Sequence, residues 1–170
     1  MNYLSPSSIQ VKEWALEGSN TLKSIHNQLK SKASKDVDDL FFKHAQKITE
    51  LVDCTTCGNC CKLLEAGLSD DEIAKLSIIK NERPEHFKRL YLLKENGSDA
   101  WYLKETPCTF LKSDCKCAIY EDRPKACINY PGLNHPGIKY RLRSVWANYE
   151  ICPIVYASVE AVKTDLANDL

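Results

Sequence analysis

The chain has 170 residues, with 23 Lys and Arg balanced by 23 Asp and Glu, so its formal net charge is zero. This length suits one ordinary domain with its own core. The neutral balance gives no support for nucleic-acid or membrane-surface binding, which usually needs a basic excess. The first residues lack the regions of a secretory signal, and no stretch reaches about 18 uncharged apolar residues. We therefore expect no membrane span and a cytoplasmic location.

The first part of the chain, residues 1–53, is helical in pattern. Ser5 is a candidate N-cap, with Pro6 at the first helical position. Apolar residues follow at roughly helical spacing: Ile9, Leu16, Leu22, Ile25 and Leu29. The stretch 18–20, Gly-Ser-Asn, leaves open whether they belong to one helix.

A clearer helix is expected after Ser34. Its apolar residues lie on one face of a 3.6-residue repeat: Val37, Leu40, Phe41, Ile48, Leu51 and Val52. The pattern runs directly into Cys54, so the end of this helix would present the first of several clustered thiols.

The central part, residues 54–131, mixes short elements. Ser69 and Glu72 form an S-x-x-E capping box that predicts a helix start, and a second helix should begin at Pro84 and continue to the Asn-Gly break at 96–97. Strands are expected at 101–104 and 116–120. The proline- and glycine-rich stretch 123–137 reads as loop with one short helical turn.

The last part, residues 132–170, ends in a predicted helix with an apolar stripe: Val155, Val159, Val162 and Leu166. These elements together predict a mainly α fold, a small α+β protein, organised as a single domain over residues 1–170. We expect its helices to pack around a cysteine-ligated metal centre, with short strands and metal-stapled loops.

Nine cysteines are the chemically informative residues. In a reducing compartment thiols do not persist as structural disulfides, so clustered cysteines favour metal binding or redox chemistry. The odd count also fits a fully paired disulfide framework poorly. A disulfide-rich secreted domain whose signal has been removed stays open as the alternative.

The first cluster reads CTTCGNCC and holds four thiols: Cys54, Cys57, Cys60 and Cys61. Two residues between cysteines let a tight turn direct both sulfurs at one metal, and Gly58 can adopt the positive φ that such a turn needs. Adjacent cysteines seldom serve one ion together. The second of the adjacent pair is therefore expected to reach another site or to bridge.

The remaining cysteines lie further along the chain: Cys108, Cys115, Cys117, Cys127 and Cys152. A lone cysteine at any of these positions would usually be a small buried hydrophobe. Their clustering favours metal ligation instead. The spacing alone does not identify the metal, because both iron and zinc accept four thiolates.

The first cluster, followed by PCTFL, CAIYEDRPKAC and YP, resembles the CxxCxxCC cysteine-cluster family over about residues 54–131. Members of that family are described as zinc- or iron-chelating, or as iron–sulfur-cluster-containing, proteins. The resemblance implies a recurring ligand set: Cys54, Cys57, Cys60, Cys61, Cys108, Cys117 and Cys127. Cys115 falls outside the pattern as a spare thiol. Cys152 would add an eighth ligand, enough for two four-thiolate sites.

Several side chains near the cysteines have expected supporting roles. Arg123 could bond to the preceding acidic side chains or to a negatively charged thiolate cluster, with a surface salt bridge as the alternative. Tyr120 and Tyr130 are expected to pack over the site. His135 is a candidate ligand with no partner at metal-binding spacing.

Two classes of function follow from the sequence. The resemblance favours an iron–sulfur protein, with a [4Fe–4S] cluster and an electron-transfer or accessory role toward an unknown protein partner. The alternative is a zinc-chelating protein in which closed zinc sites are structural or support partner binding. The sequence shows no defensible nucleophile–base pair and no glycine-rich nucleotide loop, so an independent enzyme is not expected.

Overall fold

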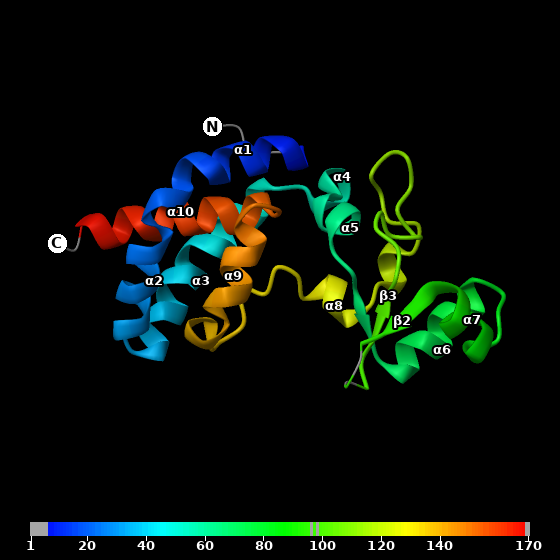
Figure 1. The fold of residues 1–170 in the computed structure, drawn as a ribbon. Helices are drawn as coiled ribbons and strands as arrows, with labels where there is room; N and C mark the ends of the chain where they lie inside the picture. Colours follow the sequence, from blue (N-terminus) through cyan, green and yellow to red (C-terminus); the bar gives the residue numbers. More distant parts are fainter. Residues whose placement is uncertain (1–6, 96, 98, 169–170) are drawn as a thin grey trace. The chain divides into compact units, whose positions relative to one another are not determined.

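The computed structural model describes residues 7–95, 97 and 99–168, with only the backbone of Ser8 and Thr56. Helices make up 65% of the structure, and a small three-stranded antiparallel sheet supplies the strands (Figure 1). The predicted fold class, mainly α with short β pieces, is therefore confirmed. Contacts divide the chain into two compact units, each described here by itself: Met1–Asn59 with Pro131–Leu170, called the helical unit, and Cys60–Tyr130, called the sheet unit. The single-domain organisation stays a prediction.

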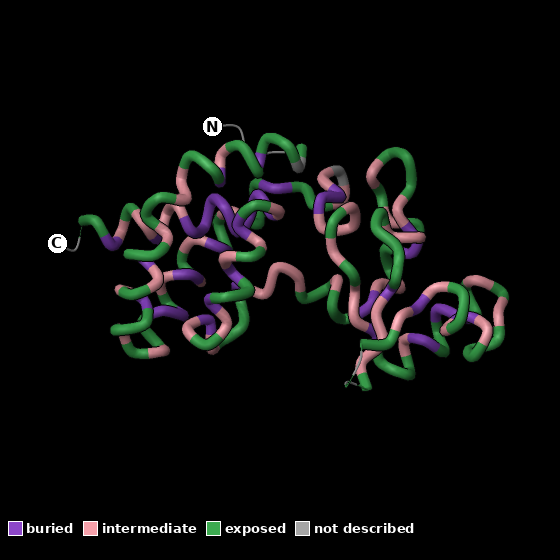
Figure 2. Tube along the Cα trace, viewed as in Figure 1, coloured by how far each residue is buried: buried purple, intermediate pink, exposed green. Residues whose placement is uncertain are grey.

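The helical unit is built around its C-terminal helix, α10. Its helices are α1 (Ser8–Gly18), η1 (Ser19–Thr21), α2 (Leu22–Ser31), α3 (Ser34–Leu51), α4 (Cys54–Cys57), η3 (Ile138–Arg141), α9 (Leu142–Tyr149) and α10 (Pro153–Asn168). The α10 helix packs against α3, α9 and α1. Its predicted apolar stripe is buried, with Val155, Val159 and Val162 fully inaccessible. Figure 2 shows the first two turns of α10 as buried, as expected for a helix covered on several faces.

The start of the chain departs from the predicted pattern. The predicted cap Ser5 and Pro6 lie outside the described residues. The α1 helix is capped by Ser7, whose hydroxyl accepts the N–H of Gln10 while the Gln10 side chain accepts the N–H of Ser7. The predicted stripe is wrong here, since Ile9 and Leu16 are exposed and the buried face carries Val11 and Ala15. The stretch 18–20 breaks the helix, because η1 separates α1 from α2.

The α3 helix buries Val37 and Phe41 as predicted, but Leu51 at its end is 57% exposed. The side chain of Asp38 is buried in this helix and accepts the backbone N–H groups of Gly137 and Ile138, both at 2.9 Å. These bonds fasten α3 to the start of η3 and satisfy a carboxylate that would be costly to bury alone.

The sheet unit contains short elements: α5 (Asn59–Leu63, beginning at the boundary), β1 (Gly67–Leu68), α6 (Asp70–Ile79), α7 (Pro84–Tyr91), β2 (Leu92–Lys94), β3 (Trp101–Leu103), η2 (Tyr120–Asp122) and α8 (Lys125–Ile128). The strands pair antiparallel in the order β1-β3-β2, with Tyr102 opposite both Gly67 and Leu93. The predicted strand at 101–104 is confirmed as β3. The predicted short turn of helix within 123–137 is α8.

Two predictions in this unit are wrong. The helix that begins at Pro84 ends at Tyr91, because the chain becomes extended and pairs as β2 before the predicted break at 96–97. The stretch 116–120 forms one isolated bridge, from Cys117 to Leu111, and no strand. Cys115 takes a positive φ of 64° in the tight turn before it, which leaves little extended chain to pair.

The core of the sheet unit is small. Its buried members come from the sheet, α6, α7 and the loops around 110–119: Leu68, Ile73, Leu76, Phe87, Leu92, Leu103, Phe110 and Ile119. Cys108 and Cys117 are partly buried and pack against this cluster. Two of the predicted ligands therefore lie at the edge of an apolar core.

Candidate metal site

The stretch CTTCG folds into the turn that its spacing predicted. Cys54 to Cys57 form the single helical turn of α4, and the Asp53 carboxylate caps it by accepting the N–H of Thr55 at 2.8 Å. Gly58 follows in the left-handed region with φ 62° and ψ 8°. A side chain at this position would be strained, which explains a glycine directly after Cys57.

In the helical unit this turn is tied to the start of α10. Asn59 is 1% exposed, and its Nδ2 donates to the carbonyl of Ile151 at 3.3 Å, next to Cys152. Cys152 is buried, and burial raises its thiol pKa to about 12. Its sulfur accepts the backbone N–H groups of residues 154 and 155 at the start of α10, while Cys54 and Cys57 interact with it electrostatically. These three thiols form the first cysteine group.

The sheet unit contains a second cysteine group, four thiols that interact electrostatically: Cys61, Cys108, Cys117 and Cys127. Burial, followed by the neighbouring thiols of Cys61, Cys108 and Cys117, raises the pKa of Cys127 to about 12. Burial also raises the pKa of Cys108 and of Cys117, each of which interacts electrostatically with Cys61. The raised pKa values keep these thiols protonated until a bound cation stabilises their thiolate forms.

Backbone hydrogen bonds hold two segments of this group in register. The N–H of Cys108 donates to the carbonyl of Cys61 at 2.7 Å, which joins the end of the CTTCGNCC stretch to the PCTFL segment. The N–H groups of Phe110 and Leu111 bond to the sulfur of Cys108, and that of Ile119 bonds to the sulfur of Cys117. Such bonds stabilise the thiolate form and fix the orientation of the sulfur atom.

A cavity of about 180 Å³ lies beside three thiols of the second group, Cys61, Cys108 and Cys127, wholly within the sheet unit. Its lining combines four thiols with mainly small or apolar neighbours: Cys60, Cys61, Leu64, Glu65, Ala66, Cys108, Ala126, Cys127 and Tyr130. Tyr130 belongs to this lining, and its packing over a metal stays a prediction. The volume is several times the ~30 Å³ that one water molecule occupies in the liquid.

Arg123 supplies positive charge to the second group. Its charge lowers the pKa of Cys61, Cys117 and Cys127, opposing the effects that raise them. The guanidinium stacks on Tyr120, 3.5 Å from the ring centroid, and its Nε donates to the Tyr120 carbonyl at 2.7 Å. The Tyr120 ring therefore packs under Arg123, with 38% of that residue exposed.

Three candidate residues remain outside these groups. Cys60 lines the cavity, with its Sγ 4.0 Å from that of Cys61. Cys115 lies in the tight turn between Lys112 and Lys116. His135 is exposed in the loop before η3 of the helical unit. Among the described residues, no three His, Cys, Asp or Glu side chains converge closely enough to hold one ion.

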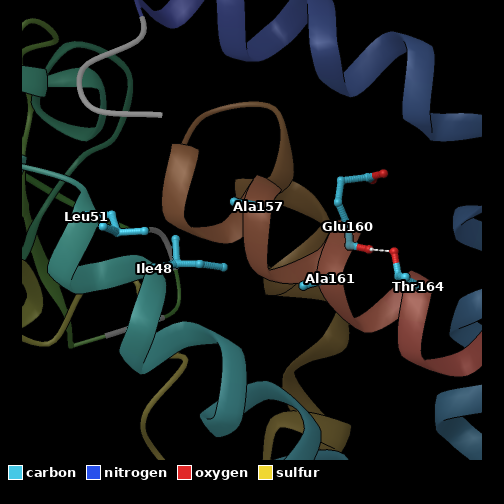
Figure 3. Close-up of a pocket in the computed structure, with 6 residues that line it drawn as sticks. All are labelled: Ile48, Leu51, Ala157, Glu160, Ala161 and Thr164. Atoms are coloured by element: carbon cyan, nitrogen blue, oxygen red, sulfur yellow. Dashed lines mark hydrogen bonds between the residues drawn. The ribbon is translucent and has the colours of Figure 1, made fainter. Parts of the chain in front are cut away.

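A second hollow, of about 320 Å³, lies between α3 and α10 in the helical unit (Figure 3). It is lined by Ile48, Leu51, Ala157, Glu160, Ala161 and Thr164. The hydroxyl of Thr164 donates to the backbone carbonyl of Glu160 at 3.0 Å, so it is satisfied within the helix. This hollow has no thiol in its lining.

The comparisons with known proteins bear on the cysteine groups. Residues 53–153 match the CxxCxxCC family, described as a "putative zinc- or iron-chelating domain". The chain belongs to the CxxCxxCC family. The CxxCxxCC match starts one residue before Cys54 and ends one residue after Cys152, so it spans both cysteine groups. No curated protein and no solved structure matches the chain.

Membership of the CxxCxxCC family supports metal binding through zinc or iron. Within the part of the chain described here, no helix is long and apolar enough to span a bilayer. The sequence did not lead us to predict the bond of Asn59 to Ile151, although a polar residue directly after the Gly58 turn pointed to a hydrogen bond there. The capping position of Cys152 was also missed, although Pro153 directly after it marks a helix start.

Proposed function

We propose that the chain binds an iron–sulfur cluster, with [4Fe–4S] as its form, through Cys61, Cys108, Cys117 and Cys127 of the sheet unit. Four cysteine thiolates are the usual ligand set of such a cluster. The observation that carries the proposal is a cavity whose walls include Cys61, Cys108 and Cys127, from three separate segments of the sequence. Cys117 lies outside this lining and interacts electrostatically with Cys61.

The size of the cavity favours a cluster over a single ion in this proposal. A four-thiolate zinc site closes around its ion with Zn–S distances of about 2.3 Å, which leaves no hollow between the ligands. A cavity of about 180 Å³ offers room for a group of several atoms. Cys60 forms part of this wall and is a fifth thiol available to the cluster.

The surroundings of the cavity suit a negatively charged cluster. Four thiolates would give the bound group net negative charge. Arg123 and the backbone N–H groups that bond to the sulfurs of Cys108 and Cys117 would offset part of it. When bound, such a cluster supplies one-electron chemistry. The proposed role is therefore electron transfer or assistance to a partner protein, in a reducing cytoplasm where these thiols stay unpaired.

Zinc is the second candidate, and the first cysteine group favours it. Cys54 and Cys57 are presented by a tight turn that Gly58 closes, and Cys152 joins them from the start of a helix. Such turns are typical of zinc-binding cysteines. These three thiols form a second candidate metal site, which needs one further ligand to complete a tetrahedral ion.

The metal content of the wild-type protein tests the proposal. Protein purified without oxygen should be brown, contain iron and acid-labile sulfide, and bleach on reduction with dithionite. Colourless protein with stoichiometric zinc and no sulfide under these conditions would refute the iron–sulfur assignment.

A pair of variants tests the division of the cysteines. Cys108→Ser should lose iron and sulfide, whereas Cys57→Ser should leave the iron in place and lower any bound zinc. Equal loss of iron from both variants would show that the two groups share one metal site.

A further inference from the structure

The last cysteine of the second group is carried by a very short helix. Cys127 lies in α8, a single turn from Lys125 to Ile128, which follows Pro124 at its N-cap. No side chain of the N-cap bonds to this turn. The backbone N–H of Lys125 therefore needs a partner from elsewhere, like every first N–H of a helix.

Glu72 provides that partner. Its Oε1 accepts the N–H of Lys125 at 2.6 Å, across 53 residues of sequence. Its Oε2 accepts the N–H and the hydroxyl of Ser69 at 2.8 and 3.0 Å, which completes the capping box of α6. One carboxylate thus serves the N-termini of two helices. Burial raises the pKa of Glu72, but the bonds from Lys125 and Ser69 outweigh burial and leave it lowered.

The helix that bears Glu72 is firmly anchored. Ile73 and Leu76 of α6 are each 1% exposed within the core of the sheet unit. The α8 turn also packs against β1, the strand that leads into α6. A second tie, from Lys75 to Asp122 at 2.8 Å, has both side chains about half exposed, and such pairs stabilise little.

We propose that Glu72 is a positioning residue of the metal site, whose carboxylate fixes α8 so that the Cys127 thiol stays at the cavity wall. The inference rests on the proposed function in that Cys127 is taken as a ligand. Glu72 is not proposed as a ligand. It acts through the backbone of Lys125, two residues before the cysteine.

Four variants of the full-length protein separate this role from simple helix capping. Glu72→Ala removes both caps. Glu72→Gln keeps one acceptor oxygen, which can serve α6 or α8 but not both. Ser69→Ala removes the hydroxyl cap of α6 and leaves the bond to Lys125. Asp122→Asn removes only the exposed ion pair.

The first measurement is the rate of metal transfer to a chelator, on the metal that the wild type carries. Loss of a cap costs enough free energy to shift a local equilibrium by about 5- to 30-fold. We expect Glu72→Ala to release metal faster by about that factor, Glu72→Gln to be intermediate, and the other two variants to match the wild type. If Ser69→Ala releases metal as fast as Glu72→Ala, the effect is fraying of α6 and the proposal fails.

The second measurement uses metal-free protein, so it holds even if the metal is not iron. The labelling rate of Cys127 by a thiol reagent is compared with that of Cys108 in the same molecules. We expect Glu72→Ala to raise the ratio of the two rates, together with amide exchange at Lys125. An unchanged ratio, or equal acceleration of both thiols, would show general destabilisation and overturn the positioning role.

Discussion

The two units of the molecule differ in the apolar cores that they bury. The helical unit centres on a 16-residue helix with large side chains such as Phe41 and Tyr149 fully buried around it. The sheet unit covers residues 60–130 with strands of two or three residues and a small apolar cluster. A unit of about 70 residues rarely supplies a sufficient core alone and is commonly stapled by metal or disulfides.

Most of the cysteines lie in the unit with the smaller core. The second cysteine group and Cys60 all belong to the unit with the weaker core, and Cys108 and Cys117 pack directly against that core. A metal held there would link α5, the 108–117 loops and α8. We therefore expect the sheet unit to depend on metal for its fold and the helical unit not to depend on it.

The largest expected effect comes from removing one thiol of the second group. Cys108→Ser should abolish metal binding in the sheet unit and loosen that unit, since a structural metal contributes on the order of 10 kcal/mol to folding in small metal-bound units. Metal content and the amide spectrum of residues 60–130 would measure it. Cys115→Ser is the matched control and should keep both, because Cys115 lies in a turn outside the group. Loss of metal from both variants would contradict this division.

A core substitution should affect the other unit alone. Phe41 is fully buried in α3, so Phe41→Ala should lower the free energy of unfolding of the helical unit by about 3–5 kcal/mol. The measurement is chemical denaturation followed in both units, with metal content alongside. Parallel loss of metal would show that the sheet unit needs the helical unit, and the contrast between them would fail.

A smaller effect is expected at the contact between α1 and α9. A Cβ on Gly18 would lie 2.2 Å from the hydroxyl oxygen of Tyr149, which also bonds to Glu160. Gly18→Ala should therefore destabilise the helical unit by about 1–3 kcal/mol, less the helix propensity that alanine gains. Thermal unfolding of the single variant and of Gly18→Ala with Tyr149→Phe would measure it. If the double variant recovers nothing, the clash is not with the hydroxyl.

The smallest effect concerns acid stability. Bonds from Lys43 and His44 lower the pKa of Asp165 on α10. A lowered folded pKa gives stability that is present above the unfolded pKa of about 3.9 and is lost as the pH falls through the folded value. Asp165→Asn should make the free energy of unfolding of the helical unit depend less on pH below about pH 4. An unchanged acid limb in denaturation curves would contradict this.

Local chemistry made parts of the fold predictable. The capping box of Ser69 and Glu72, the buried stripe of α10 and the turn closed by Gly58 all depend on residues close in sequence. The predicted buried face of α1 was wrong. Packing against α10 and α9 decides which face is buried, and that face carries Val11 and Ala15.

The metal site was predictable in content but not in arrangement. The cysteines were recognised as a set, yet nothing in their spacing indicated that Cys152 would join Cys54 and Cys57 rather than the thiols of the sheet unit. In the structure Asn59, two residues after Cys57, bonds to the carbonyl of Ile151 directly before Cys152. The second bond of Glu72 was equally hidden, since its partner Lys125 lies 53 residues away.

Hydrogen exchange with and without metal tests the contrast between the units most directly. The full-length protein would be compared as purified, after removal of the metal by a chelator, and after metal is restored. We expect amides of residues 60–130 to lose protection without metal and regain it afterwards, while those of α3 and α10 stay protected throughout. Equal protection of the sheet unit in all three states would contradict the dependence of its fold on metal.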